Sequence, residues 1–556
     1  MADIVSRIYS NFRGVDFRGE EINLVRSPDS LNVWKDYKET ESIRTRPALE
    51  IVRTFNKPVY GVFFFKGVML VHSGTVLYTV IDGTATRLYS GLKDAASSCF
   101  IYEDIWYFKD GLNYLKYDGE TIEPVEGYIP TTSIARKPGG GGTKYEDVNM
   151  LSDYRINSFL SDGTSFDYYL DVMNIDEDFP PVVKVNDEVV KSGYTVDYEN
   201  GKITFTAAPD VPLTDGQDNV VVQFKKEVPR YKDSILNSTL LQVFDNRVFF
   251  SGNETYSNTV WHCSLNDPSY VSDLDYYREG MDAARIKGMV AGNNALWVFR
   301  EPSGANTNVF YHTPTLDESY GKIYPSSHSS VTTGCIGKAI NFNDDIVFFS
   351  DRGMEGISGD VTTEQVVAHR SSMVDRKLIA EPKYQDMILE EWEGYLLVFI
   401  GDKVYLADSR AVFNNENHIE YEWFYWNLGK EVTCTNVQNG VLYIGTTDGL
   451  YTLTDMESDV ESYWVTPKDK FNYPHKLKTS NKRGCVAEAT GDITVYAKVE
   501  DSDFELIGKY ENITDYFVSR IKRKKFKDIQ LKFQSSKRFS LETVTLECFI
   551  GGYIKR

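Results

Sequence analysis

The sequence predicts an all-β protein built on a β-propeller of about seven blades. Three observations favour this fold class: aromatic residues and glycine are abundant, a pattern of strand, turn and strand recurs, and its copies are regularly spaced. The 556 residues include 37 tyrosines, 31 phenylalanines and 40 glycines. Aromatic side chains fit a pleated surface and glycine permits tight reversals, so many short strands are expected.

The repeated pattern is first seen between Val68 and Gly91, where turns at Ser73-Gly74 and Asp82-Gly83-Thr84 separate three strand-like runs. Similar runs follow at 104–117, 246–252, 294–311, 344–357, 394–406 and 439–453. Once one large interruption is removed, the copies recur at roughly 40 to 50 residues, the period expected of propeller blades. Small twisted sheets around an axis bury surfaces that an isolated hairpin leaves exposed. The alternative is a set of unrelated hairpins in β-sandwiches, because the copies share a pattern and not identical residues.

Shifts in composition divide the chain into five segments. They are an extended N-terminal arm at 1–50, the first part of the propeller at 51–130, an inserted small β-sandwich at 131–230, the second part of the propeller at 231–464 and a C-terminal β-domain at 465–556. The arm has too little apolar content to be stable unless it lies on another surface.

The insert begins with four consecutive glycines, Gly139 to Gly142, which predict a flexible or tightly reversing connector. Alternating strand-like runs follow. Asn186-Asp187 and Glu199-Asn200-Gly201 lie between such runs, as hairpin turns do.

The formal net charge of −21 argues against a protein that reads DNA sequence, because phosphate backbones are repelled. It is compatible with a surface past which nucleic acid slides. The six cysteines have no CxxC spacing and predict buried thiols in a reducing compartment: Cys99, Cys263, Cys335, Cys434, Cys485 and Cys548. Neither a signal-peptide core nor an apolar run of about eighteen residues is found, so synthesis in a cytoplasm without a membrane span is expected.

Motifs for catalysis or cofactor binding are weak. The segment GGGGTK at 139–144 lacks the Gly-Lys-Ser/Thr order of a phosphate-binding loop. Ser161-Asp162-Gly163-Thr164 matches only a fragment of the sialidase Asp-box. Asn174, Asp176 and Asp178 alternate like calcium ligands but lack the glycine of an EF-hand loop.

The histidines are dispersed at His72, His262, His312, His328, His369, His418 and His475, without metalloprotease spacing, and no Gly-x-Ser-x-Gly elbow occurs. We therefore predict no catalytic, cofactor-binding or metal-ligating residue, no cofactor and no enzymatic activity.

The one local departure from acidity is the run from Arg520 to Lys527, with the sequence RIKRKKFK. It could contact DNA phosphates. It could equally be a solvated edge strand that lysine protects from unwanted pairing, or a charge partner for an acidic neighbouring subunit; these two interpretations are favoured.

The N-terminal residues NFRGVDFRGEEINLVRSPDSLNVW, with Arg44-Thr45-Arg46-Pro47 after them, resemble the opening of bacteriophage tail proteins of the nozzle or tail-tubular type. The insert resembles the small β-modules of tail and tail-fibre proteins at SFLSDGTSFDYYL and at VVKVNDEVVKSGYTVDYENGKITFTAAP, and the ending FIGGYIKR is similar to such components. Together these pieces cover about a third of the chain.

This resemblance implies a non-enzymatic virion structural protein, found in the tail and synthesised and assembled in the bacterial host cytoplasm. It implies a homo-hexameric ring that contacts the portal or adaptor and other tail proteins, lines the channel for genome ejection and touches phage double-stranded DNA transiently. We expect the arm and the insert to contact neighbouring subunits.

Two alternatives remain. A tail-tip receptor-binding protein that recognises host surface glycan is favoured by aromatic runs such as EYEWFYWN at 420–427, because aromatic faces stack on sugar rings. A propeller glycoside hydrolase would need two acids held about 5 to 10 Å apart, which 81 acidic residues could supply by chance.

Overall fold

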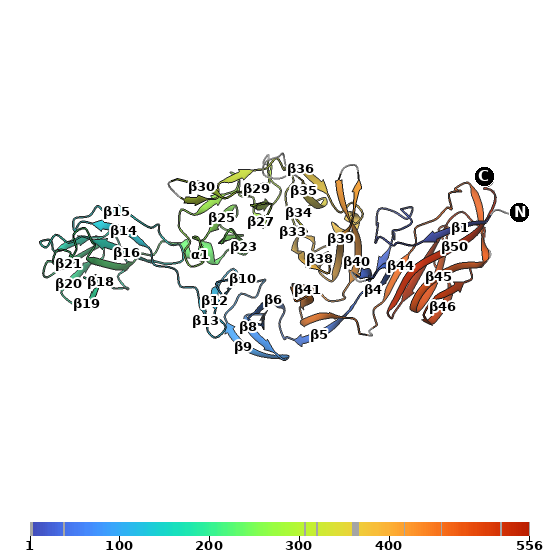
Figure 1. The fold of residues 1–556 in the computed structure, drawn as a ribbon, viewed down its shortest axis with the longest axis horizontal. Coiled ribbons are helices and arrows are strands. Elements are labelled where there is room, and N and C mark those ends of the chain that lie inside the picture. The colour runs from blue at the N-terminus through green and yellow to red at the C-terminus, as the bar shows by residue number, and fades with distance from the viewer. Residues whose placement is uncertain are drawn as a thin grey trace. The chain divides into compact units, whose positions relative to one another are not determined.

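The computed structural model describes residues 4–36, 39–304, 307–318, 321–358, 366–415, 418–456, 459–522 and 525–554 (Figure 1). Within these residues the regular structure consists of β-strands with two short α-helices and one 3-10 turn, which confirms the all-β class. They form two compact units. The first unit holds residues 1–96, 306–309 and 329–556, and the second holds residues 97–305 and 310–328. None of the described helices is long and apolar enough to cross a membrane.

Four-stranded antiparallel sheets recur in the first unit. They are formed by β6 (Val59–Phe65), β7 (Val68–Ser73), β8 (Val76–Ile81) and β9 (Thr84–Ser90); by β33 (Ala339–Phe342), β34 (Asp345–Ser350), β35 (Gly353–Ser358) and β36 (Val366–His369); by β37 (Ile388–Trp392), β38 (Tyr395–Ile400), β39 (Lys403–Asn415) and β40 (His418–Asn427); and by β41 (Val432–Gln438), β42 (Val441–Thr446) and β43 (Gly449–Thr454) with β5 (Ala48–Thr54). The first strands of successive sheets are neighbours, β37 beside β41 and β41 beside β6. All six residues of β38, YLLVFI, are buried, as expected of a strand covered on both faces.

The last of these sheets is completed from the other end of the chain. β5 pairs antiparallel with β43, from Ala48 opposite Thr454 to Thr54 opposite Gly449. The N-terminal segment therefore supplies the outer strand of a sheet whose other strands lie near residue 440. This long-range pairing fixes the two regions together through backbone hydrogen bonds.

The second unit contains three further four-stranded sheets in its described part. They are formed by β10 (Ser98–Tyr102), β11 (Ile105–Lys109), β12 (Tyr114–Tyr117) and β13 (Ile122–Pro124); by β23 (Leu240–Phe244), β24 (Arg247–Ser251), β25 (Thr259–His262) and β26 (Tyr276–Arg278); and by β27 (Ile286–Gly292), β28 (Ala295–Arg300), β29 (Val309–His312) and β32 (Ser326–His328). β30 (Thr315–Asp317) and β31 (Gly321–Ile323) form a separate hairpin. First strands are again neighbours, β10 beside β23 and β23 beside β27.

Each of these seven sheets has the same connection between its first two strands. Two residues join them, and both residues have positive φ: Lys66-Gly67, Glu103-Asp104, Asp245-Asn246, Asn293-Asn294, Asn343-Asp344, Glu393-Gly394 and Asn439-Gly440. Two positive φ values define the type I′ turn, whose twist matches that of a hairpin and which favours Asn, Asp and Gly. The repeats detected in the sequence start at or just after these turns and fall mainly on the second and third strands of equivalent sheets, such as β7 with β8 and β34 with β35.

The insert consists of two sheets around one core. The larger is ordered β15 (Thr143–Lys144), β14 (Thr131–Arg136), β16 (Tyr154–Phe159), β22 (Val220–Lys225), β18 (Val182–Val185) and β19 (Glu188–Val190); the smaller is β17 (Asp167–Tyr169), β21 (Lys202–Phe205) and β20 (Tyr194–Asp197). Phe159 and Val222 of the larger sheet share a buried cluster with Tyr168 and Phe205 of the smaller one. Two sheets that bury a common core are a β-sandwich. α1 (Tyr231–Leu236) follows the insert.

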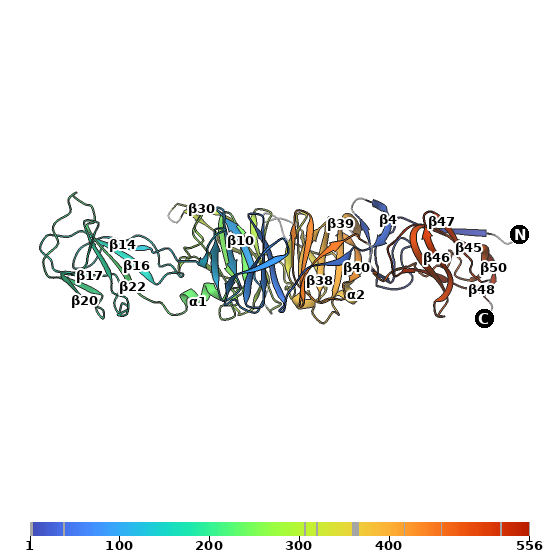
Figure 2. The same cartoon turned by 90° about the horizontal axis from the view of Figure 1, so that it is seen from below.

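The C-terminal region forms a sheet of eleven strands in the described part of the chain (Figures 1 and 2). Its own strands are β44 (Ser462–Val465), β45 (Lys476–Val499), β46 (Glu505–Ile513), β47 (Tyr516–Ser519), β48 (Lys525–Phe526), β49 (Ile529–Ser535) and β50 (Phe539–Tyr553), and four come from the N-terminus: β1 (Ile4–Tyr9), β2 (Ser30–Leu31), β3 (Val33–Asp36) and β4 (Glu39–Thr45). β45 and β50 pair along much of their length, and β1 and β4 pair with β50.

The N-terminal arm, which was expected to need another surface to lie on, pairs with the C-terminal region. The strands of the arm are members of the C-terminal sheet, because pairing with β50 and β44 satisfies the backbone groups that a free arm would leave to water. Tyr9, Phe12, Val33 and Trp34 are buried in one hydrophobic cluster with residues of the C-terminal sheet and of sheet β37–β40.

We predict that Gly14→Ala destabilises the first unit by about 2–4 kcal/mol, because it adds both overpacking and backbone strain. Gly14 has a φ of +87°, and a Cβ there would lie 1.9 Å from the backbone oxygen of Trp423 in β40. Gly19→Ala in the same arm is the matched control, since nothing lies within 4 Å of its Cβ position. Chemical denaturation of the two variants measures the difference, and equal stabilities would contradict the close approach.

Candidate functional site

The N-terminal residues that carry the resemblance lie against sheet β37–β40. The backbone N–H of Asn32 donates to Tyr425 O at 3.0 Å, and the side-chain oxygen of Asn32 accepts from Asn427 N at 2.8 Å and from Arg46 Nε at 3.0 Å. Arg46 also donates to Asn427 O at 2.9 Å. Burial lowers the pKa of Arg46 to about 10. The segment SPDSLNV at 27–33 and the Arg46-Pro47 pair are therefore joined to each other and to the end of β40.

Three tryptophans, Trp34, Trp392 and Trp426, pack together next to this contact. The Trp34 ring stacks on Trp392 with centroids 5.3 Å apart, and it meets Trp426 edge to face at 5.5 Å. Trp426 donates its indole N–H to Val33 O at 3.3 Å. Aromatic pairs of these geometries stabilise a buried contact beyond the area they remove from water.

A buried ion pair holds the middle of the arm. Arg26 donates to both carboxylate oxygens of Glu422 in β40, at 3.0 and 2.8 Å, and Arg13 lies 3.9 Å from the same carboxylate. Only 1% of the Glu422 side chain is exposed, and burial raises its pKa. Two parallel hydrogen bonds fix the direction of approach as well as the distance.

We predict that Arg26→Met destabilises the first unit by about 3–5 kcal/mol, because it leaves the Glu422 carboxylate buried without its main partner. Lys383→Met is the control: its ion pair with Glu431 has side chains that are 50% and 46% exposed, and an exposed pair contributes about 0–1 kcal/mol. Thermal unfolding of both variants tests the contrast. A similar loss in the two would show that the buried pair has no special role.

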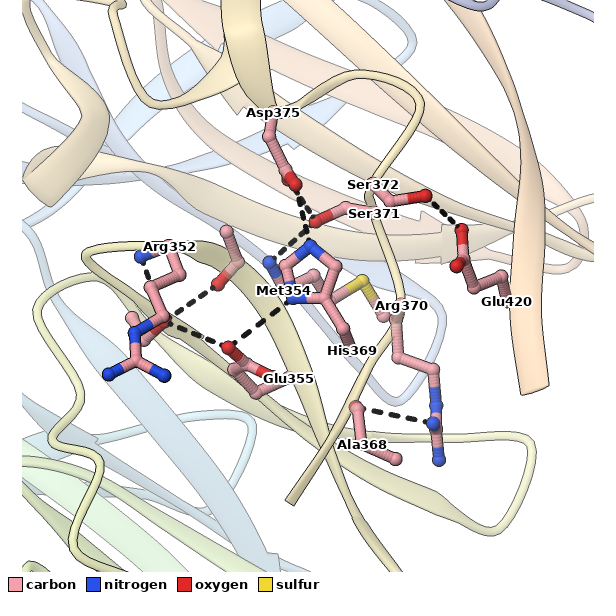
Figure 3. A network of polar contacts seen from close by, with 12 residues as sticks. Arg352, Met354, Glu355, Ala368, His369, Arg370, Ser371, Ser372, Asp375 and Glu420 are labelled. Carbon is pink, nitrogen blue, oxygen red and sulfur yellow. Dashed lines mark hydrogen bonds and ion pairs between the residues drawn. The ribbon is translucent and has the colours of Figure 1, made fainter. Parts of the chain in front are cut away.

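A polar network lies beside this contact, where β36 leads into α2 (Asp375–Leu378) (Figure 3). His369 is paired directly opposite Glu355 across β35 and β36. Its Nδ1 lies 3.3 Å from Glu355 Oε1 and its Nε2 lies 2.6 Å from Asp375 Oδ2. Burial alone would lower the pKa of His369, but the hydrogen bonds with Asp375 and Glu355 outweigh it and raise the pKa to about 10.

Ser371 completes the network without pairing with the histidine. Its hydroxyl donates to Asp375 Oδ1 at 2.6 Å and accepts from Met354 N at 2.7 Å. A protonated imidazole cannot take the proton of a hydroxyl, and the Ser371 proton is already directed at a carboxylate. The arrangement holds the loop after β36 in place; it does not activate a nucleophile.

The same loop connects two sheets and the arm. Arg370 makes a two-point ion pair with Asp345 of β34, at 2.8 and 3.2 Å, and its carbonyl accepts from the Trp423 indole N–H at 3.2 Å. Ser372 donates to Glu420 of β40. The N–H of Phe17 in the arm donates to Met373 O at 2.8 Å. Residues 369–375 are therefore the meeting point of β33–β36, β37–β40 and the arm.

We predict that His369 stabilises the fold below neutral pH and that this contribution, about 1.5–3 kcal/mol, is lost in alkali. Its pKa rises from 6.5 unfolded to about 10 folded, so the folded state binds more protons between these values and stability falls as pH rises. The stability difference between wild type and His369→Gln should therefore be largest below pH 6.5 and should shrink towards pH 10.

His262 is the matched control because its pKa shift has the opposite sign. Burial lowers its pKa to about 4, so the unfolded state binds more protons between about pH 4 and 6.5 and stability falls as pH falls. The stability difference between wild type and His262→Gln should accordingly change between about pH 4 and 6.5. If the stability difference between wild type and His369→Gln did not change between pH 6.5 and 10, the raised pKa of His369 would be overturned.

Other sequence candidates have structural roles. Gly140, Gly141 and Gly142 take positive φ in a tight reversal between β14 and β15, and a strand follows instead of the helix of a phosphate-binding loop. Asp162 accepts from the N–H groups of Thr164 and Ser165 and from the Ser165 hydroxyl, which lowers its pKa. Asn186-Asp187 and Gly201 form the expected hairpin turns.

Lysine side chains contact Asn174 and Asp176, two of the alternating residues in the insert that resemble calcium ligands. Asp176 lies 3.9 Å from Lys225 Nζ and accepts from Glu227 N, while the carbonyl of Asn174 accepts from Lys226 Nζ at 2.6 Å. The described residues contain no group of three or more His, Cys, Asp or Glu side chains suited to holding a metal ion.

The remaining candidates are distributed through the fold. None of the six cysteines, all in the described part, forms a disulfide; four are buried, and Cys99 and Cys434 are partly exposed. His312 Nε2 lies 2.9 Å from Glu279 Oε1, and both side chains are fully buried. In the basic run, Arg523 and Lys524 lie outside the described residues, and Lys525-Phe526 form β48.

Sequence reasoning missed the network around His369. Its partners are a residue on the facing strand and one six positions later, and no motif marks that spacing. Alternation in β35 and β36 could have placed Glu355 and His369 on one face, but their register depends on the turn between them.

No protein-family model matches the chain, and no curated protein matches it. Among solved structures, the chain is similar to BamB from Moraxella catarrhalis at 12% identity and a TM-score of 0.33, over 74% of this chain and 97% of that one. It is similar to the computationally designed Ika8 protein at 11% identity and a TM-score of 0.30, over 73% and 99%. It is also similar to the Neurospora crassa Pan2 WD40 domain at 9% identity and a TM-score of 0.26, over 74% and 97%. These TM-scores are low, and the similarities assign no function.

Proposed function

We propose that this protein is a non-enzymatic structural subunit of a bacteriophage virion. In this proposal it is a nozzle-like tail or neck protein that assembles as a homo-hexameric ring and lines the channel for genome ejection. Its partners are the portal or adaptor, other tail proteins and, transiently, phage double-stranded DNA. It is made in the host cytoplasm and becomes part of the tail.

The proposal includes the closure of the four-stranded sheets into one seven-bladed propeller. Three features of the described residues support it. The sheets share a type I′ turn between their first two strands, and the first strands of several successive sheets are neighbours: β37 with β41, β41 with β6, β10 with β23 and β23 with β27. β5 completes the sheet of β41–β43 from the opposite end of the chain, which is a common way to close a ring of blades.

The observation that carries the functional proposal is the role of the residues with phage-tail resemblance. Arg26, Asn32, Trp34 and Arg46 are all engaged in fixing the arm to sheet β37–β40. Gly14 is required for the same approach because of its contact with Trp423. The residues that carry the resemblance therefore all help to fix the arm to sheet β37–β40. Residues that matched by chance would not need to share one role, and this supports the proposal.

The charge of the chain is compatible with a conduit. A net charge of −21 repels a polyanion and so does not retain DNA during its passage. A body made of sheets with buried ion pairs is also stiff, which suits a wall that must withstand internal pressure.

The receptor-binding alternative has less support at the residues that suggested it. In the segment 420–427, Tyr421, Trp423 and Trp426 are 3%, 0% and 1% exposed, so they form part of the core and offer no face to a sugar. Exposed aromatic side chains do occur in the insert, where Tyr145 is 63% and Phe166 is 51% exposed. A glycan-binding surface would have to use exposed aromatic residues such as these, or others such as Tyr516 and Tyr553.

Electron microscopy of purified virions tests the proposal. The chain should form a symmetric ring with an open channel on the tail axis, and antibodies against the insert should label that ring. Absence of the chain from particles, or its presence only at fibre tips with direct adsorption to host cells, would contradict the proposal. Cleavage of host glycans by the purified chain would contradict the non-enzymatic role.

A further inference from the structure

The C-terminal sheet contains a groove with an apolar floor and a basic rim. It encloses about 600 Å³. Its lining consists of Ala497, Val499, Leu506, Ile507 and Ile521, with Arg520, Lys522 and Glu505 at the edge. The Leu506 side chain is 53% exposed, so part of the floor is open to water. An exposed apolar floor of this kind favours an occupant with its own apolar side chain.

The basic rim is available for a partner. Arg520 and Lys522 are exposed and form no ion pair with any residue that the structure describes. Glu505 takes part in another interaction of its own. In a chain with a net charge of −21, a pair of free cations next to an apolar floor is a local exception. Charge complementarity therefore points to an acidic occupant with an apolar anchor.

The insert carries a loop of this chemistry. The segment Pro209 to Gln217 has the sequence PDVPLTDGQ, in which Leu213 is 91% and Val211 is 58% exposed. Asp210 and Asp215 flank these two side chains in the sequence, and both are exposed. Exposure of two neighbouring apolar side chains on a loop costs free energy that burial in a partner would recover.

The loop is held in a defined shape before any binding. The Asn219 side chain donates to Asp210 O at 2.9 Å, Gln217 N donates to Thr214 O at 3.1 Å, and the Asp218 carboxylate accepts from Ala135 N at 2.9 Å. Pro209 and Pro212 restrict the backbone between these anchors. A loop that is already ordered loses little conformational entropy on docking.

We propose that the loop Pro209–Gln217 of one copy of this chain docks into the groove of a second copy. Leu213 fills the apolar floor, and Asp210 and Asp215 pair with Arg520 and Lys522. The contact is heterologous, because the two copies contribute different surfaces, and such contacts repeat into a ring when the rotation between copies closes. This inference rests on the proposed ring and identifies one contact within it.

An acidic, apolar loop fits the groove better than DNA does. Phosphate backbones would use the two cations but leave Val499, Leu506 and Ile507 without a function. The overall acidity of the chain also opposes DNA. Nucleic acid is therefore an alternative outcome of the test.

Binding of a labelled peptide of residues 207–218 to the full-length chain, followed by fluorescence anisotropy, tests the contact without requiring a ring. We expect saturable binding that weakens with salt and becomes at least tenfold weaker with Arg520→Glu. The Leu213→Asp peptide should not bind. Lys509→Glu is the control, because Lys509 lies on β46 outside the groove. No binding, equal binding by Arg520→Glu, or Arg520-dependent binding of duplex DNA in place of the peptide would overturn the proposal.

A second experiment distinguishes failure of this contact from failure of the proposed ring. It measures whether the full-length Leu213→Asp chain is incorporated into virions. We expect the Leu213→Asp chain to be absent from virions. The control variant Leu316→Asp should be incorporated normally, since Leu316 is a comparably exposed side chain at 84%. Incorporation of both variants would overturn the docking contact and leave the ring intact. A wild-type chain that forms no ring would instead remove the proposed function, while the peptide result would still stand.

Discussion

The pairing of the N-terminal segment with strands near the other end of the chain is the constraint on which the first unit depends. β5 supplies the outer strand of the sheet begun by β41, and β1 and β4 pair with β50. Bringing such distant segments together costs chain entropy, but the cost grows only slowly with loop length. The many backbone hydrogen bonds and the buried aromatic cluster around Trp34 offset it. One consequence is that the arm and the C-terminal sheet cannot be separated without exposing a shared core.

Buried ion pairs fix the orientation in which the arm and the loops pack against the sheets. Hydrophobic contacts tolerate small displacements, whereas a two-point ion pair such as Arg26 with Glu422, or Arg370 with Asp345, is satisfied in one geometry. Both pairs, and the network around His369, occur where a loop or the arm crosses from one sheet to another. Breaking them leaves an uncompensated charge, so they oppose sliding more than they add to the total stability.

The interior and the surface of the described residues carry different features, and the structural role that we propose uses both. The polar clusters hold loops, the histidine lies between two carboxylates that raise its pKa, and the aromatic residues that suggested sugar binding lie in the core. The exposed features are of a different kind: an ordered acidic loop with an apolar tip, and a groove with a basic rim. The contact that we propose between them would be heterologous, and such contacts form a ring when the rotation between copies closes.

The sequence by itself determined much of the local structure: the all-β class, the repeated strand pattern and the hairpin turns of the insert. Alternation and turn residues act over a few positions, so Asn439-Gly440 or Asn186-Asp187 specify a hairpin wherever they occur. Only the tertiary structure decided that the arm belongs to the C-terminal sheet, that β5 completes a distant sheet, that Trp423 and Trp426 are buried and that His369 meets Asp375. Such pairings depend on which surfaces remain uncovered after the local elements form, and no short-range spacing in the chain records that.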